Sequence, residues 1–151
     1  MRRLLAGLLL AGVAACGGDD KPAPTVPSVD VSANTEQVCA AVEERLTQSV
    51  AAFTSEVPGK IAQASGSASA QAEVVQRVKA AFAEWAALMR TEGARAADPG
   101  LRSALAETAT QFDSAAASIR GYDDLKDIQA LMGNPALAEA GAKLQRYCGG
   151  D

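Results

Sequence analysis

Apolar residues recur at helical spacing along most of the chain, and the first stripe of them follows Asn34. Its members lie three or four positions apart, which places them on one face of a helix. Asn34, with Gln37 three residues later, matches the capping pattern of a helix N-terminus. Pro58 predicts an end or a kink, and residues 58–70 are compatible with either a loop or a helical extension. The stripe consists of Val38, Val42, Leu46, Val50 and Phe53.

Two further stripes predict helices over residues 72–93 and 99–122. Asp98 is a favourable N-cap, and Pro99 suits the first position of a helix. Steps in the later stripe alternate between four and three residues, which is the spacing of a seam in an antiparallel bundle. The stripes consist of Val74, Val75, Val78, Phe82, Trp85, Leu88 and Met89, and of Leu101, Leu105, Thr108, Phe112, Ala115, Ile119 and Tyr122.

The C-terminal part repeats these signals on a shorter scale. A short apolar segment ends at Gly133, and Asn134 with Pro135 repeats the pairing of a cap with a proline. Gly149 is a natural stop for the last helix. No strand pattern of any length appears in the sequence. The chain therefore predicts an all-α domain over residues 34–151: an antiparallel helical bundle of three long helices plus one or two shorter C-terminal helices.

Charged residues fall mainly outside the apolar stripes, as the solvent-facing side of each helix requires. Glu73 and Arg77 are one helical turn apart, and so are Glu139 and Lys143. Such spacing predicts an ion pair within each of two helices. Acidic residues are accordingly expected mainly at the surface.

The N-terminus carries a different pattern, in which Arg2 and Arg3 precede an apolar run over residues 4–15 that stops at Cys16. As a helix this run would span about 18 Å, against about 30 Å for the hydrocarbon core of a bilayer. A charged start, a short apolar stretch and small residues before the end are typical of a secretory signal peptide. The run is therefore predicted to be a removed signal rather than a membrane span.

The last four residues of this region, Val13-Ala14-Ala15-Cys16, resemble the lipobox of bacterial lipoproteins. The resemblance covers only the first sixteen residues. It implies that a diacylglyceryl group is attached to the Cys16 sulfur, that the peptide is cut before it, and that Cys16 becomes the first residue. Two acyl chains hold a protein firmly at a membrane, because each buried methylene contributes about 0.8 kcal/mol. The alternative is an ordinary secretory signal with an incidental cysteine.

This interpretation divides the chain into three parts. Residues 1–15 are a removed lipoprotein signal peptide, and residues 16–33 are the lipidated cysteine with a flexible linker. The linker is rich in proline, glycine and aspartate and has no apolar period, which is typical of a spacer. The high alanine and glycine content suggests a source among GC-rich Gram-positive bacteria. Residues 34–151 resemble small helical lipoproteins of such bacteria only in general terms, and that resemblance implies no known activity.

Charge and histidine content narrow the range of functions. The formal net charge is −4, and the chain has no histidine. An acidic chain without a long basic cluster argues against nucleic-acid binding. The absence of histidine removes the Ser-His-Asp and Cys-His nucleophiles and the histidine zinc and di-iron sites.

The two cysteines that remain after lipidation of Cys16 are Cys39 and Cys148. In an exported domain a pair is most simply a disulfide, with free thiols as the alternative. Cys39 lies near the start of the first predicted helix and Cys148 at the end of the last. If these helices pack antiparallel, the two Cα atoms come within the roughly 4.4–6.8 Å that a disulfide requires.

Few other residues suggest chemistry. Trp85 lies on the apolar stripe of its helix with Phe82, and such residues usually anchor a core, although with Phe112 they would also suit an apolar ligand site. Three nearby aspartates invite calcium but lack the ligand loop of an EF-hand. No nucleophile has a base partner, so the sequence predicts no metal site, no cofactor and no enzymatic activity. The aspartates are Asp123, Asp124 and Asp127.

These observations predict a lipoprotein anchored to the extracytoplasmic face of the cell membrane through Cys16. Its expected role is an interaction or structural module of the cell envelope, with an envelope protein as partner and no nucleic acid. The alternative is an extracytoplasmic bundle that binds a small ligand at an apolar site near Phe82, Trp85 and Phe112.

Overall fold

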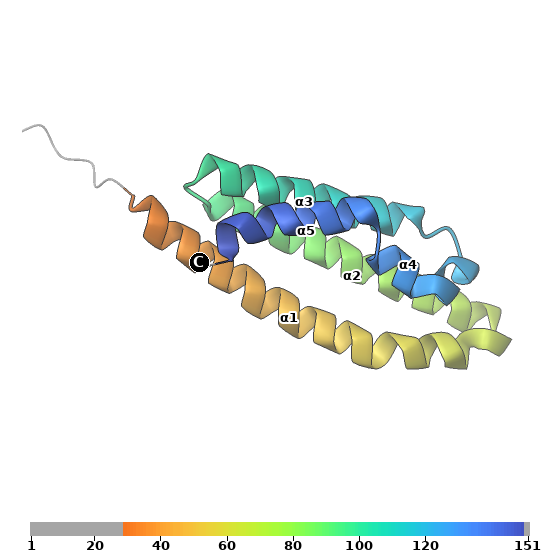
Figure 1. Ribbon diagram of the computed structural model, residues 1–151. Helices are drawn as coiled ribbons and strands as arrows, with labels where there is room; N and C mark the ends of the chain where they lie inside the picture. The colour runs from red at the N-terminus through yellow and green to blue at the C-terminus, as the bar shows by residue number, and fades with distance from the viewer. Residues whose placement is uncertain (1–28, 150–151) are drawn as a thin grey trace, which may run out of the picture.

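The computed structural model describes residues 29–149 and contains helices but no strand within that range (Figure 1). The predicted signal peptide, the lipidated Cys16 and nearly all of the predicted linker lie outside the described residues. The all-α prediction, with three long helices and shorter C-terminal ones, is confirmed. The elements are α1 Val31–Gln63, the 3₁₀ turn η1 Ala64–Gly66, α2 Ala68–Arg95, α3 Pro99–Ser118, the 3₁₀ segment η2 Tyr122–Asp127, α4 Ile128–Met132 and α5 Pro135–Cys148.

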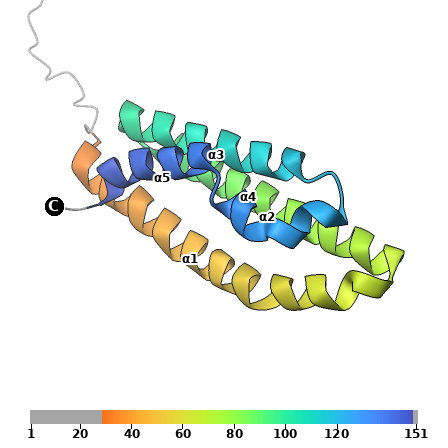
Figure 2. The same cartoon turned by 45° about the vertical axis from the view of Figure 1, so that its right-hand side comes forward.

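The long helices run antiparallel to their neighbours (Figures 1 and 2). Helix α2 packs against both α1 and α3, and α5 lies along α3 and meets α1 again near its start. The start of α1, the connection between α2 and α3 and the end of α5 thus lie at one end of the bundle, here called the disulfide end. The turn between α1 and α2, together with η2, forms the opposite end, here called the far end.

Helix starts follow the predicted caps in the later part of the chain. Asp98 accepts a hydrogen bond from the backbone N–H of Leu101 at 2.7 Å, and Asn134 accepts one from Ala136 at 2.9 Å. In both helices a proline occupies the first turn. Helix α3 ends at Ser118 rather than Tyr122, because the chain turns extended at Ile119.

Helix α1 begins earlier than the sequence predicts. Its cap is Asp30, whose carboxylate accepts a hydrogen bond from the backbone N–H of Ala33 at 3.1 Å. The prediction that Asn34 caps this helix is therefore wrong. Asn34 lies inside the helix, and its side chain bonds to the connection between α2 and α3 instead. The folded part therefore starts before residue 34 and includes residues that the sequence assigned to the linker.

Pro58 neither ends α1 nor starts a loop, since the helix continues to Gln63. Val57 is buried before the proline and Ala64 after it, so packing on both sides holds the chain in helical form. This packing outweighs the lost backbone hydrogen bond. Helix α1 bends in its last third, the part that contains the proline (Figures 1 and 2). Residues 58–70 are thus helix, one 3₁₀ turn and the start of α2.

The predicted ion pairs within single helices do not form. Arg77 of α2 binds Glu56 of α1 at 2.9 Å, and Lys143 of α5 binds Glu107 of α3. Each cation therefore joins two helices rather than stabilising one. The sequence spacing allowed both arrangements, and helix packing selects the pairs between helices.

Candidate functional site

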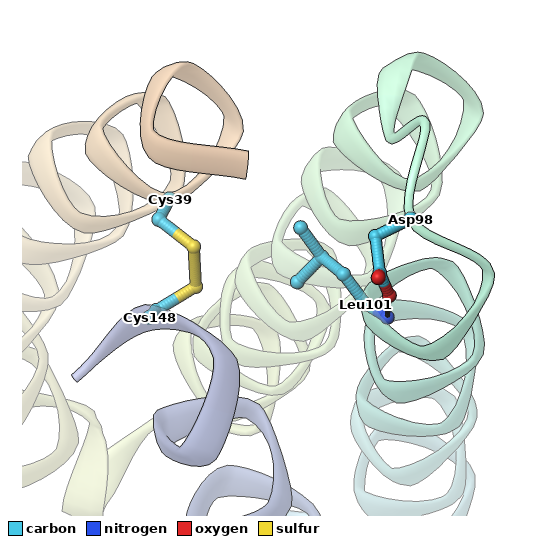
Figure 3. The surroundings of a disulfide bond; sticks show 4 residues. All are labelled: Cys39, Asp98, Leu101 and Cys148. Atoms are coloured by element: carbon cyan, nitrogen blue, oxygen red, sulfur yellow. Dashed lines mark hydrogen bonds between the residues drawn. A yellow bond between two sulfur atoms is a disulfide. The ribbon is translucent and has the colours of Figure 1, made fainter. Parts of the chain in front are cut away.

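A disulfide between Cys39 and Cys148 joins the first part of α1 to the last residue of α5 (Figure 3). The two Cα atoms are 5.3 Å apart, within the range that disulfides require. The predicted bridge and the antiparallel pairing of the first and last helices are both confirmed. The bridge closes almost the whole folded region, since the two cysteines are 109 residues apart in sequence.

The disulfide lies beside the first turn of α3. Leu101 is fully buried, and its side chain points from α3 toward the bridge (Figure 3). The ring of Tyr147 lies over Gly100, where an added Cβ would come within 3.0 Å of the Tyr147 Cε1 atom. Glycine at this position therefore lets the end of α5 sit directly on the start of α3.

Glu92, in the last turns of α2, is completely buried, although the sequence pattern predicts acidic residues mainly at the surface. Arg45 donates to one carboxylate oxygen at 3.2 Å and Arg95 to the other at 2.8 Å. A buried carboxylate is tolerated only when cations and hydrogen bonds compensate its lost hydration. The two arginine side chains remain 58% and 57% exposed, so water reaches the outer side of this cluster.

Asn34 fastens the start of α1 to the chain between α2 and α3. Its amide nitrogen donates to the carbonyl of Arg95 at 3.1 Å, and its amide oxygen accepts from the backbone N–H of Ala97 at 2.7 Å. Arg102 donates to the carbonyl of Ala96 at 2.7 Å. The non-helical connection at this end is thus satisfied by side chains from two helices.

A groove of about 640 Å³ runs between α1 and α5 beside the disulfide. Its apolar floor comes from Val42, Leu46 and Leu144, and Glu43 and Gln145 supply polar edges. The groove opens because α1 and α5 contact each other only near the bridge, whereas α5 packs along much of α3. It is an accessible surface at the disulfide end, distinct from the aromatic core.

The far end holds a polar cleft of about 670 Å³ between η1, the first turn of α2 and η2. The backbone N–H groups of Arg120 and Gly121 donate to the Asp124 carboxylate at 2.7 and 3.0 Å and hold its pKa below the ordinary value. Asp123 pairs with Lys126 at 2.6 Å, and this contact raises the pKa of the lysine. Asp123 and Asp124, two of the aspartates considered as calcium ligands, thus bond to other groups of the same chain.

Phe82, Trp85 and Phe112, the predicted ligand-lining residues, form one buried cluster with Phe53 in the core. Neighbouring ring centroids are 5.1 to 6.3 Å apart, and most of these pairs pack edge to face. Trp85 also donates its indole N–H to Ser49 at 2.6 Å. The clefts between α1 and α2, between α1 and α5 and at the far end are lined by residues other than these three. Their role as core anchors is therefore established, and a ligand-lining role stays a prediction.

Residues 29–149 contain neither a metal-binding cluster of side chains nor a membrane-spanning helix. No group of three or more Cys, Asp or Glu side chains in this range is placed to hold a metal ion. Every buried side-chain nitrogen or oxygen described has a hydrogen-bond partner. None of the described helices combines the length and apolar character needed to cross a bilayer. The disulfide and the buried Glu92 cluster both serve to join helices.

Comparison with protein-family models, with curated proteins and with solved structures finds no match to this chain. Its function is therefore inferred from its own residues. The features available for that inference are the disulfide, the buried Glu92 cluster, the two accessible clefts and the N-terminal motif of the sequence.

Proposed function

We propose that this protein is a lipoprotein anchored to the extracytoplasmic face of the cell membrane through Cys16. Its folded part is an interaction or structural module of the cell envelope and not an enzyme. The partner is a protein of the envelope rather than nucleic acid, because the chain is acidic and has no long basic cluster.

The observation that carries this proposal is the disulfide between Cys39 and Cys148. Structural disulfides persist in oxidising compartments outside the cytoplasm and are rare inside it. The signal-like N-terminal segment of the sequence and the disulfide of the fold are both consistent with export. The lipobox-like Val13-Ala14-Ala15-Cys16 then supplies the anchor.

The packing supports a module that binds a protein partner or has a structural role, more than one that binds a small ligand or catalyses a reaction. The aromatic residues that would suit an apolar ligand are packed against one another. Buried charge is used at Glu92 to join α1 and α2, with both carboxylate oxygens engaged by arginines. A bundle braced in this way presents fixed surfaces, which suits recognition of a protein partner.

The anchor is tested by Cys16→Ser in cells of the source organism or a related host. The variant should remain at the mass of the uncleaved precursor, because the cut requires the lipidated sulfur. Gly18→Ser is the matched control, since it introduces the same side chain two positions away and should be processed normally. Processing and release of Cys16→Ser to the same extent as the parent would contradict the proposal.

The module is tested by placing a photo-crosslinking amino acid at exposed positions on living cells, one position per variant. Glu43 samples the groove between α1 and α5, and Asp123 samples the far end. We expect one position to crosslink reproducibly to a defined envelope protein while the other does not. Turnover by the purified protein that a single Ser, Asp or Glu substitution abolishes would contradict the non-enzymatic assignment.

A further inference from the structure

Exposed large apolar side chains are confined to one end of the described chain. Three such residues stand out: Val29 is 66% exposed, Val31 46% and Tyr147 39%. Val31 is the first residue of α1, Val29 lies two residues before it, and Tyr147 belongs to the last turn of α5. All three therefore lie at the disulfide end, and the far end has none among the described residues.

Helices α1 and α5 are fixed to the rest of the bundle at this end. The disulfide ties the last residue of α5 to α1, and the ring of Tyr147 is seated on Gly100 of α3. Asn34 fastens the first turns of α1 to the chain after α2. Val31 and Tyr147 thus belong to the two helices that the bridge joins.

The length of chain before the fold limits which end can face the membrane. Val29 lies thirteen residues after Cys16, and in any conformation this stretch spans at most about 45 Å. Helix α1, with 33 residues, is itself about 50 Å long. An inverted bundle standing upright, with its far end on the lipid, would hold Val29 beyond the reach of an anchor at Cys16, so the upright orientation within reach has the disulfide end toward the lipid.

We propose that the disulfide end rests on the lipid surface, with Val29, Val31 and Tyr147 in the interfacial layer. This proposal rests on the lipid anchor proposed above and adds a second, non-covalent contact. Tyrosine is enriched in this layer because its side chain is amphipathic. The hydroxyl end of Tyr147 lies against Gly100, so the exposed part of the side chain would contact the lipid. Three side chains would bind a membrane weakly on their own, but the tether makes their insertion intramolecular and so favours it.

The net charge of the chain predicts how this membrane contact depends on salt. Removal of Arg2 and Arg3 with the signal changes the formal net charge from −4 to −6, counting −4 − 2 = −6. Such a chain is repelled by anionic lipid, so the contact must be apolar and should persist at high salt. The far-end cleft then points away from the membrane, toward the rest of the envelope.

The contact is tested with the full lipidated protein in vesicles of phosphatidylcholine whose acyl chains carry bromine. Tyr147→Trp places a fluorophore at the contact, and buried Trp85 gives the same background in every variant. The emission of the introduced indole should shift to the blue and be quenched by the brominated chains, at low and high salt alike. Asp123→Trp at the far end is the matched control and should be quenched no more than the parent. Val31→Trp repeats the test at the other helix if the tyrosine variant fails to fold.

Flotation of the vesicles and the mass of the N-terminal peptide report the anchor separately. Protein that floats with lipid on Cys16, but whose Tyr147→Trp and Val31→Trp variants emit like the Asp123→Trp control, would overturn the membrane contact and leave the anchor intact. Protein that neither floats nor carries lipid on Cys16 would overturn the proposed function, and the contact with it.

Discussion

The two ends of the bundle are held together in different ways. At the disulfide end, a covalent bridge, a buried carboxylate with two arginines and the amide of Asn34 connect α1 to the rest of the fold. Toward the far end the connections are an ion pair between half-exposed side chains and single hydrogen bonds: Arg77 pairs with Glu56 of α1, and Tyr122 donates to the carbonyl of Ile61. Lys79 of α2 donates to the carbonyl of Ile119, just after α3, at 3.2 Å.

This difference shows where the fold resists opening. Helix α1 packs mainly on α2, and the bridge, Arg45 and Asn34 add connections along its first half. The strongest connections thus occur where the proposed tether enters and where any pull from the membrane would act. The far end needs less reinforcement, because α1 and α2 are joined there by a short turn.

Removal of the disulfide should have the largest effect. The double variant Cys39→Ser/Cys148→Ser removes both thiols of the bridge and should lower the free energy of unfolding by about 4–5 kcal/mol on the chain-entropy model. Urea unfolding measures the loss. Hydrogen exchange should show added local opening in the first turns of α1 and the last turn of α5. Equal loss of protection at both ends would remove the contrast between them.

Removal of the cations around Glu92 should come next. Arg45→Met with Arg95→Met leaves a buried carboxylate unpaired and should cost about 3–5 kcal/mol of unfolding free energy. Addition of Glu92→Met should restore much of that loss, because the uncompensated charge is gone. Arg146→Met, at an exposed arginine outside the ion pairs of the described residues, is the matched control. A double arginine variant as stable as this control would show that the cluster is not a brace.

A far-end contact should matter less. Tyr122→Phe removes one neutral hydrogen bond to the carbonyl of Ile61, which also accepts from the backbone N–H of Ala64. The expected loss in unfolding free energy is about 0.5–1.5 kcal/mol. Thermal or urea unfolding tests this directly. A loss of unfolding free energy as large as that of the double arginine variant would show that the two ends contribute equally to stability.

The smallest effect concerns pH at the far end. The pKa of Asp124 is lowered by backbone N–H donors, so its stabilising contribution is present above the unfolded value and is lost as pH falls through the folded pKa. A carboxyl titration followed by NMR should have its midpoint below 3.8. Asp124→Asn should abolish the associated shifts of the Arg120 and Gly121 amides. A midpoint at or above that value would contradict the observed hydrogen bonds.

Much of this architecture follows from sequence patterns because buried stripes and proline-marked caps are local signals. The caps at Asp98 and Asn134 are predictable, since a proline follows each one directly. The cap of α1 is not, because Asp30 and Asn34 are both suitable residues and only tertiary contacts assign the amide of Asn34 elsewhere. Contacts between helices, such as that of Arg77 with Glu56, depend on packing that no single stripe contains.

The buried acid was predictable in part. Glu92 lies seven residues after Trp85 and three after Met89, which places it on the buried stripe of α2. Its two arginine partners were not predictable, because Arg45 comes from another helix. The aromatic residues taken as ligand-lining candidates show the converse limit: a stripe predicts that rings face the core, but only their packing decides whether space remains between them.

The central claim is that this disulfide-closed bundle is exported and held at a membrane by lipid on Cys16. Mass spectrometry of the protein isolated from its native membrane tests it most directly. The predicted N-terminal peptide begins at Cys16 and carries the mass of a diacylglyceryl group, and the peptides of Cys39 and Cys148 stay linked until reduction. An unmodified N-terminus that begins elsewhere, or cysteines that react with alkylating reagent without reduction, would contradict the account.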